Sequence, residues 1–378
     1  MCATPLRSMK IDFRRLTPDE RSRWEDLAAV AAEPNPFFLP ALLGPAFDHL
    51  DRHREVALIR AEADGLLIGL FPVIVRRRHG RYPIRNIATW MHCQCFFGAP
   101  LIRATYEKTA WATLLDQIDR ISPDADFLHL EGLALEGPVA DALRASCAAG
   151  RRKCKLISAH ERAMLQSDLT ADAYLSKHVR AKKRKEMRRL QNRLEELGTV
   201  VRRRLSATDD VEQWALDFLA LESAGWKGEE GTALGNNNHT RAYFLEALAN
   251  SHASGMLDML RIDLDDAPVA MLVNFRSGAG AFSYKIAFDE RFSRFSPGVL
   301  IEMDNLHAVL SDPSLGWMDS CAAPNHPMID GIWAGRRTIG QFRVELKGRG
   351  LAGVRRKALF AATGAAEHVL KRARGLRR

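Results

Sequence analysis

Apolar and β-branched residues alternate with polar ones in the first part of the chain, a pattern typical of strands. EVALIRAE at 55–62 and LLIGLFPVIVR at 66–76 are joined by Ala63-Asp64-Gly65, and an Asp-Gly turn between two such stretches predicts a β-hairpin. The same patterns predict strands at 84–89, 96–102 and 126–133, and helices at 34–50 and 106–121. We therefore expect a mixed α/β domain over residues 1–165.

The second part of the chain shows three strand-like stretches in immediate succession. They cover 256–264, 268–277 and 281–289, with Asp265-Asp266 and Gly278-Ala279-Gly280 as turns, which predicts an antiparallel meander. Before it we expect a strand at 200–207, helices at 211–224 and 240–251, and a Gly- and Asn-rich loop at 225–238. A second domain over 166–350 follows from this order, with a basic helix or tail at 351–378.

The stretch SKHVRAKKRKEMRRLQNR at 176–193 holds nine Lys or Arg residues against a single Glu186. Met187, Leu190, Leu194 and Leu197 recur at three- and four-residue steps, which predicts a helix at 172–197 with Asp172 as N-cap and Gly198 as C-cap. Nine positive charges minus one give +8, out of a formal net charge of +9 for the chain. The basic character is therefore local, which disfavours a uniformly basic nucleic-acid-binding protein.

The N-terminus lacks the apolar core of a signal peptide, and no apolar run approaches the roughly 18 to 20 residues that cross a bilayer. We expect a cytoplasmic protein, with peripheral contact at the inner membrane face left open. The six cysteines show no paired framework and are expected to be free thiols. His92-Cys93-Gln94-Cys95 has no second Cys/His pair at zinc-like spacing, so we interpret it as a buried strand and expect no metal.

A strand-to-helix junction follows the meander at 291–310, RFSRFSPGVLIEMDNLHAVL. Ser296 stands at an N-cap position, Pro297 at the first helical position, and Gly298 permits close backbone approach. An Arg-bearing loop that opens into a helix N-terminus is typical of an anion site. An ordinary strand-to-helix turn explains the same residues, and both interpretations stay open here.

Polar and ionisable residues gather at the end of the next predicted strand, LGWMDSCAA at 315–323. The following PNHPMIDGIW contains two prolines, which indicate an irregular turn before a short helix. This arrangement is expected to bring Asp319, Ser320, Cys321 and His326 to one strand end, where chemistry is often carried out.

Several segments together resemble a known family. NPFF at 35–38, the basic helix, LESAGWKGEEGTAL at 221–234, SYKIAFDERFSRFSPG at 283–298 and DSCAAPNHPMI at 319–329 resemble the FemAB-like branch of the GNAT acyltransferases. Within it the chain looks like the cellulose-biosynthesis-type acetyltransferases, a group that includes some bacterial ceramide synthases. The resemblance covers about residues 30–345. It implies an α/β (α+β) fold of two GNAT-like domains, each a mixed, mostly antiparallel sheet flanked by helices.

The resemblance also implies a donor site in the second domain. By position, Arg294, Ser296, Pro297 and Gly298 would hold the pyrophosphate of acyl-CoA, a co-substrate rather than a tightly bound cofactor. The loop has fewer glycines than the commonest GNAT pattern. The donor therefore stays open between CoA and an acyl carrier protein.

Acyl transfer to an amine requires a base that takes a proton from the nucleophile. Candidates are Asp319, His326 and Glu222; each also has a structural explanation as a cap, a partner for carbonyls or a helix residue. Cys321 is better explained as a core thiol than as a nucleophile. Trp226, Lys227 and Lys285 are candidates for holding substrate.

The leading hypothesis is an N-acyltransferase that acylates a primary amine. An amphipathic acceptor, such as a sphingoid base or an amino sugar of an envelope polysaccharide, suits a basic surface that attracts anionic lipid. A second hypothesis replaces the thioester by aminoacyl-tRNA, with the basic helix on RNA phosphates. A third, a non-enzymatic nucleic-acid-binding protein, is disfavoured because no recognition motif is present.

Overall fold

The computed structural model describes residues 16–121, 124–348 and 350–375, without the side chains of 226, 227 and 365–375. The chain forms two compact units, each made of segments far apart in sequence. Unit 1 comprises Met1–Phe38, His53–Ala159 and Thr338–Arg378, and unit 2 comprises Leu39–Arg52 and His160–Arg337. The domains expected from the sequence are contiguous, whereas these units interleave. Within the described residues, no helix combines the length and the apolar character needed to span a bilayer.

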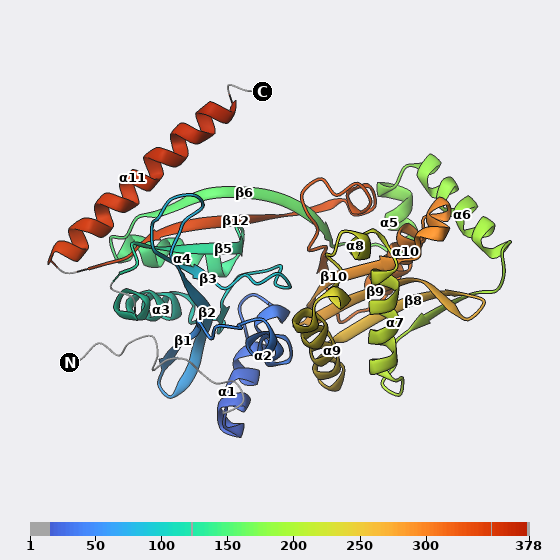
Figure 1. The fold of residues 1–378 in the computed structure, drawn as a ribbon, viewed down its shortest axis with the longest axis horizontal. Helices are drawn as coiled ribbons and strands as arrows, with labels where there is room; N and C mark the ends of the chain where they lie inside the picture. The colour runs from blue at the N-terminus through green and yellow to red at the C-terminus, as the bar shows by residue number, and fades with distance from the viewer. Residues whose placement is uncertain (1–15, 122–123, 349, 376–378) are drawn as a thin grey trace. The chain divides into compact units, whose positions relative to one another are not determined.

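Unit 1 is built on a sheet with strand order β1-β2-β3-β5-β12 (Figure 1). The predicted hairpin is confirmed: β1 and β2 pair antiparallel, and Asp64 and Gly65 turn the chain with φ of 51° and 78°. Positive φ at both turn positions matches the twist of the flanking strands. The elements of this unit are α1 (Pro18–Ala29), η3 (Pro36–Phe38), β1 (Val56–Ala63), β2 (Leu66–Arg76), β3 (Asn86–Thr89), β4 (Leu101–Ile102), α3 (Glu107–Ile121), β5 (Phe127–Ala134), α4 (Pro138–Ala149) and α11 (Gly350–Gly375).

Two long strands have residues in both units: β6 (Cys154–Leu165) and β12 (Gly335–Glu345). Neither these strands nor α4 were predicted by the hydrophobic pattern. The prediction of a strand at 92–95 is wrong, because the chain turns there: the Cys95 N–H donates to the His92 carbonyl over 2.9 Å, and Cys93 is exposed while Cys95 is buried. The five described cysteines are free thiols.

Unit 2 contains the sheet order β6-β11-β10-β9-β8-β7. The predicted meander is confirmed, with β8 pairing β9 and β9 pairing β10, all antiparallel. The helix predicted at 34–50 is shorter in the structure, where α2 covers Pro40–His49. The strand predicted at 315–323 is also shorter, because β11 covers only Trp317–Asp319. The elements are α2 (Pro40–His49), α5 (Ala171–His178), α6 (Ala181–Glu195), β7 (Val200–Arg204), α7 (Val211–Ser223), α8 (Trp226–Glu229), η4 (Leu234–Asn236), α9 (Asn238–Ala253), β8 (Leu257–Leu264), β9 (Ala267–Ser277), β10 (Gly280–Phe288), η5 (Glu290–Phe295), α10 (Pro297–Leu310), β11 (Trp317–Asp319) and η6 (Ile329–Gly331).

The basic stretch forms two helices, so the prediction of one helix at 172–197 is wrong. The N-cap is Thr170, and Val179 adopts an extended conformation (φ −106°, ψ 125°) that separates α5 from α6. Val179 is buried in the same core cluster as Leu175, and its β-branched side chain suits the extended conformation at the break. Gly198 is not a left-handed C-cap; it lies against the carboxylate of Asp265, which accepts a hydrogen bond from the Thr199 N–H over 2.8 Å.

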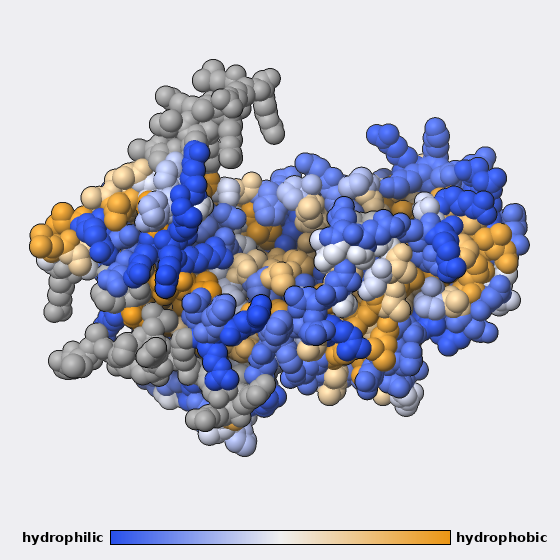
Figure 2. Space-filling view, in the orientation of Figure 1, coloured by the Kyte–Doolittle hydropathy of each residue, from blue (hydrophilic) through white to orange (hydrophobic). Residues whose placement is uncertain are grey.

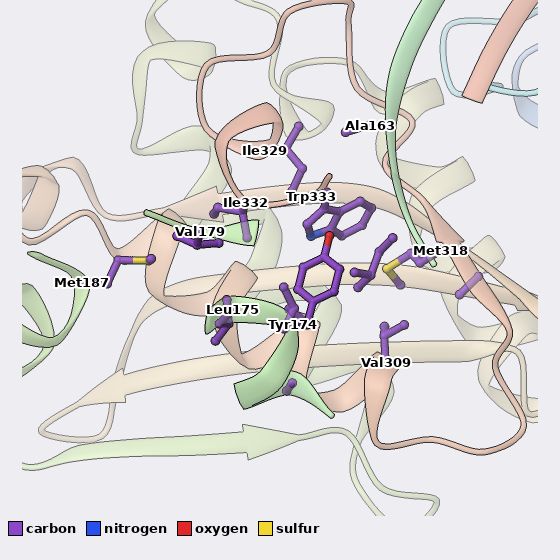
Figure 3. Packing of buried hydrophobic residues seen from close by; sticks show 14 residues of the cluster. Ala163, Tyr174, Leu175, Val179, Met187, Val309, Met318, Ile329, Ile332 and Trp333 are labelled. Carbon is purple, nitrogen blue, oxygen red and sulfur yellow. The ribbon is translucent and has the colours of Figure 1, made fainter. Parts of the chain in front are cut away.

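One apolar cluster in unit 2 collects residues from α5, α6, α10, β6 and β11 (Figure 3). Tyr174 and Trp333 are its largest members, and the Tyr174 hydroxyl accepts a hydrogen bond from the Ala334 N–H over 2.8 Å. Met187 joins the same cluster and Leu194 is also buried, whereas Leu190 is half-buried and Leu197, beyond the end of α6, is 44% exposed. The predicted apolar side of the basic helix is therefore buried at two of its four positions. The cluster thereby holds α6 and α10 in one rigid layer.

Candidate active site

Strands β10 and β11 begin together and then separate. They pair in parallel only from Gly280 to Phe282, opposite Trp317 to Asp319, where β11 ends. From there to Phe288, β10 pairs with β9 alone, and it carries a bulge between Ser283 and Lys285. Within the described residues, no strand pairs with this edge of β10 beyond Phe282. Such an edge can hydrogen-bond a bound ligand.

The chain then enters α10 through a tight junction. Ser296 has left-handed dihedral angles (φ 51°, ψ 54°), and Pro297 is the first residue of the helix, as predicted. The Ser296 side chain makes no capping hydrogen bond, whereas its carbonyl accepts from the N–H groups of Val299 and Leu300 over 2.9 and 3.1 Å. The positive end of a 14-residue helix therefore follows β10 after the single short helix η5.

Gly298 is buried at this junction. A Cβ placed on it would lie 3.2 Å from Cδ1 of Phe288 and 3.5 Å from Sδ of Met328. The close approach predicted for this glycine is therefore made to two side chains of the same unit.

Two arginines lie on η5, immediately before the junction. Arg291 is held by Asp289, with Nε 3.0 Å from both carboxylate oxygens. Arg294 is exposed, and its guanidinium carbon lies 4.7 Å from the centre of the Phe295 ring. Of the two, Arg294 is therefore better placed to meet an anion from solvent.

A depression with a cavity volume of about 30 Å³ opens where the end of α7 meets the end of β10. This volume is far below that of drug-sized ligand pockets, so the depression suits a small head group rather than a whole large ligand. Four apolar residues, one glycine and two carboxylates line it: Leu221, Ile286, Ala287, Phe288, Gly225, Glu222 and Glu290.

The two carboxylates differ in exposure. Glu222 is 4% exposed, and its Oε2 accepts a hydrogen bond from the Leu234 N–H over 2.8 Å. Glu290 is exposed, and a Cβ on Gly225 would lie 3.0 Å from its Oε1, so this carboxylate reaches over the glycine. Two negative groups beside an apolar wall suit a cationic amine that carries an apolar substituent.

Asp319, at the end of β11, is completely buried between two arginines. Its Oδ1 lies 2.6 Å from Nε of Arg162, and its Oδ2 lies 3.0 Å from an amino nitrogen of Arg337. Oδ1 also accepts from the Cys321 N–H over 2.9 Å. Burial raises the pKa of Asp319, but the two arginine charges and these hydrogen bonds together hold the pKa below its ordinary value. A carboxylate with a low pKa is a weak base, so the structure favours a positioning role for Asp319.

The other sequence candidates lie at separate places in unit 2. His326 is half-buried in the turn between β11 and η6, and its carbonyl accepts from the Asp330 N–H over 3.1 Å. Lys285 is half-buried on β10, with Nζ 5.5 Å from the centre of the Tyr284 ring. Trp226 and Lys227 begin α8 directly after Gly225 of the depression, but their side chains lie outside the described residues.

Sequence reasoning missed Glu290, Arg162 and Arg337 as parts of this region. Arg162 and Arg337 lie on β6 and β12, the two strands that the hydrophobic pattern did not predict. Glu290 follows a predicted strand directly, and an acidic residue at a strand end could have drawn attention to it. Across the described ranges, no three His, Cys, Asp or Glu side chains gather as metal ligands would.

Residues 181–321 match the family model described as Acetyltransferase (GNAT) domain. This span runs from α6 to just past β11 and includes the depression, strand β10 and the junction into α10. No curated protein matches the chain.

Three solved structures share the fold over most of this chain. FemX is 12% identical with a TM-score of 0.57, covering 87% of this chain and 96% of its own. A conserved protein of unknown function from Bacteroides thetaiotaomicron is 12% identical with a TM-score of 0.55, covering 86% and 97%. The C-terminal domain of a putative lysylphosphatidylglycerol synthetase from Agrobacterium fabrum is 12% identical with a TM-score of 0.54, covering 91% and 95%.

The expected α/β fold with mostly antiparallel sheets and flanking helices is confirmed. The narrower resemblance, to the cellulose-biosynthesis-type acetyltransferases, stays a prediction. The chain is similar to GNAT and FemAB-like proteins in fold, and its residues 181–321 carry the match to the GNAT acetyltransferase domain.

Proposed function

We propose that this chain is an N-acyltransferase that moves an acyl group from a thioester donor to a primary amine. The observation that carries the proposal is the position of the last part of β10, beyond the residues that pair with β11. Ile286, Ala287 and Phe288 lie in this part of the strand and also line the acidic depression. Phe288 in turn packs against Gly298 at the start of α10. The acceptor pocket, the strand edge and the anion-binding helix end are therefore contiguous.

This geometry supports direct attack by the amine. The ammonium group of the acceptor binds between Glu222 and Glu290 and loses a proton to Glu222. The neutral nitrogen then attacks the thioester carbonyl carbon and the C–S bond breaks. The nitrogen loses its second proton, which reaches the departing thiolate through water. Backbone N–H groups beside the reacting carbonyl stabilise the negative charge that develops on its oxygen.

The remaining candidates take supporting roles in this proposal. Arg294 and the backbone at Ser296, Pro297 and Gly298 bind the phosphate of the donor. Lys285 on β10 and Trp226 and Lys227 on α8 flank the acceptor side. Asp319 positions the end of β11 through its ion pairs, and His326 is the second candidate for the base, through a water molecule.

An amphipathic acceptor fits the depression best. Its wall of Leu221, Ile286, Ala287 and Phe288 is apolar, so an aliphatic chain next to the amine gains more from burial than a sugar does. A sphingoid base is therefore favoured over an amino sugar of an envelope polysaccharide. The structural similarity to a domain named for lysylphosphatidylglycerol synthesis supports an acceptor linked to lipid. Such an acceptor would be met by a cytoplasmic enzyme at the inner membrane face.

Release of free thiol tests the proposal. Acetyl-CoA and palmitoyl-CoA would be offered with sphinganine, glucosamine and a lysine peptide as acceptors. We expect Glu222→Gln to lower kcat/KM by about 100-fold or more, since general-base catalysis contributes about that much. Glu212→Gln, an exposed change on the same helix, is the matched control.

No thiol release with any donor and acceptor would refute the thioester proposal. Salt-sensitive binding of tRNA in that case would support aminoacyl-tRNA as the donor instead, since the exposed cations of α6 would then contact RNA phosphates.

A further inference from the structure

One face of α6 carries several cations. The first turn of this helix contains no acidic residue. Met187 and Leu194 are its buried residues, and Lys182, Lys185 and Arg188 are exposed. At 100° per residue these three cations lie on the side of the helix opposite the buried pair. Figure 2 shows a hydrophilic surface over α5 and α6.

Several cations of α6 lie at its N-terminal end, where the helix dipole disfavours positive charge. Arg180 is the N-cap and provides no side-chain hydrogen bond, and Lys182, Lys183, Arg184 and Lys185 follow it directly. Positive charge at a helix N-terminus is unfavourable because the helix dipole is positive there. These cations therefore do not stabilise the isolated helix, and an anionic partner would relieve the repulsion.

The buried side of α6, opposite these cations, packs next to the junction proposed to bind the donor. Leu194 of α6 belongs to the same apolar cluster as Phe295 of η5 and Leu300 of α10. The helix is thus fixed to the two elements that surround Ser296, and a partner bound to its outer face would approach that junction.

The junction also limits the size of the anion. Pro297 has no N–H, and the N–H groups of Val299 and Leu300 already bind the Ser296 carbonyl. Few donors are left for a pyrophosphate. A single phosphate, as in a phosphopantetheine arm, requires fewer.

We propose that the exposed face of α6 docks a small acidic carrier protein that delivers the acyl group on a phosphopantetheine thioester. This inference rests on the proposed function, because it names the donor of the same site. The α6 face lacks the exposed apolar residues that insert into a bilayer, and it lacks the aromatic residues that stack on RNA bases. A folded acidic protein complements a rigid row of cations directly.

The test compares two donors and two charge-reversed variants of the full chain. Palmitoyl carrier protein and palmitoyl-CoA would be offered with sphinganine, and the ratio of kcat/KM for the two donors measured. The variant Lys182→Glu/Lys185→Glu/Arg188→Glu is expected to lower that ratio at least tenfold. The control Arg77→Glu/Arg78→Glu/Arg81→Glu reverses three exposed arginines of unit 1 and is expected to change it less than twofold.

Folding would be checked by thermal melting, and the reversal is tolerable because it places acids at a helix N-terminus. If it unfolds, Lys182→Gln/Lys185→Gln/Arg188→Gln is expected to lower the ratio about threefold. Binding of carrier protein with a free thiol, measured by fluorescence anisotropy, separates docking from catalysis. If the wild-type protein binds the carrier protein and the α6 variant does not, docking is supported even when no donor releases thiol. The absence of thiol release would then refute only the proposed function.

An unchanged donor ratio, or no binding of the carrier protein, would overturn the proposal. The proposal would also be overturned if the wild-type protein binds tRNA, or vesicles with 30% phosphatidylglycerol, but not the carrier protein, and if the α6 variant loses that binding.

Discussion

The Oδ1 atom of Asp319 lies 2.6 Å from Nε of Arg162, and the two side chains are 0% and 4% exposed. Removing one partner of a buried ion pair leaves the other charge uncompensated. We expect Asp319→Asn to lower the free energy of unfolding by about 3–5 kcal/mol, measured by urea denaturation. Asp330→Asn, whose carboxylate lies 3.8 Å from Arg336 near the surface, is the control and should change it by less than about 1 kcal/mol.

The same pair has a pH signature. The folded-state pKa of Asp319 is lowered, so its contribution is complete above the unfolded pKa of about 3.9 and is lost as the pH falls through the folded pKa. The stability difference between wild type and Asp319→Asn should therefore be constant from pH 5 to 8 and shrink in stronger acid. A difference that disappears already at pH 6 would contradict the assignment.

Glu302 provides the opposite case. It is buried in α10, where Asn305 donates to its Oε2 over 3.1 Å, and burial raises its pKa from 4.5 to about 7 despite that bond. The folded state thus holds the proton more tightly than the unfolded state. Its contribution is fully present below about pH 4.5 and is lost as the pH rises to about 7.

We therefore expect wild type to lose about 2.5 kcal/mol more stability than Glu302→Gln between pH 5 and 8. The variant keeps an amide oxygen for Asn305 and has no proton to lose. Urea denaturation at several pH values measures the difference, and Glu212→Gln should follow wild type throughout. Parallel curves for wild type and Glu302→Gln would show that Glu302 does not titrate in this range.

Arg294→Ala tests the donor side of the site. Because a charged hydrogen bond to phosphate contributes about 1.5–3 kcal/mol, the KM for acyl-CoA should rise about tenfold or more while the melting temperature stays constant. Arg291→Ala is the matched control, since Asp289 already holds that guanidinium. Unchanged kinetics in a folded Arg294→Ala protein would remove this arginine from the donor site.

Local patterns predicted the elements whose signals lie within one stretch of chain. The Asp64-Gly65 turn, the meander and the Pro297 helix start each depend on residues that are neighbours in sequence. Strands β6 and β12 were not predicted, because their partner strands come from distant segments of the chain. Met318 pairs with Leu165 of β6, and Arg343 of β12 pairs with His129. Strand β6 also contains LISAHERAML, which shows no regular alternation.

In the candidate site, too, the residues that could be predicted were those whose signal lies within one stretch of chain. The junction at Ser296 was found because its residues are consecutive, and Glu222 because it precedes a glycine-rich loop. The arginines that surround Asp319 could not be found, since only folding brings Arg162 and Arg337 to one carboxylate. The depression itself needs α7 and β10 side by side, a relationship that no single stretch encodes.

Helix α2 is part of unit 2, although its sequence lies within the stretch that otherwise builds unit 1. His49 at its end contacts Glu246 of α9 over 2.7 Å, across 197 residues of chain. On the ribosome, this apolar helix emerges long before the segment that covers it, at synthesis rates of about 5–20 residues per second. The apolar side of α2 is therefore exposed on the nascent chain for about ten seconds or more, which is long enough for a chaperone to bind it.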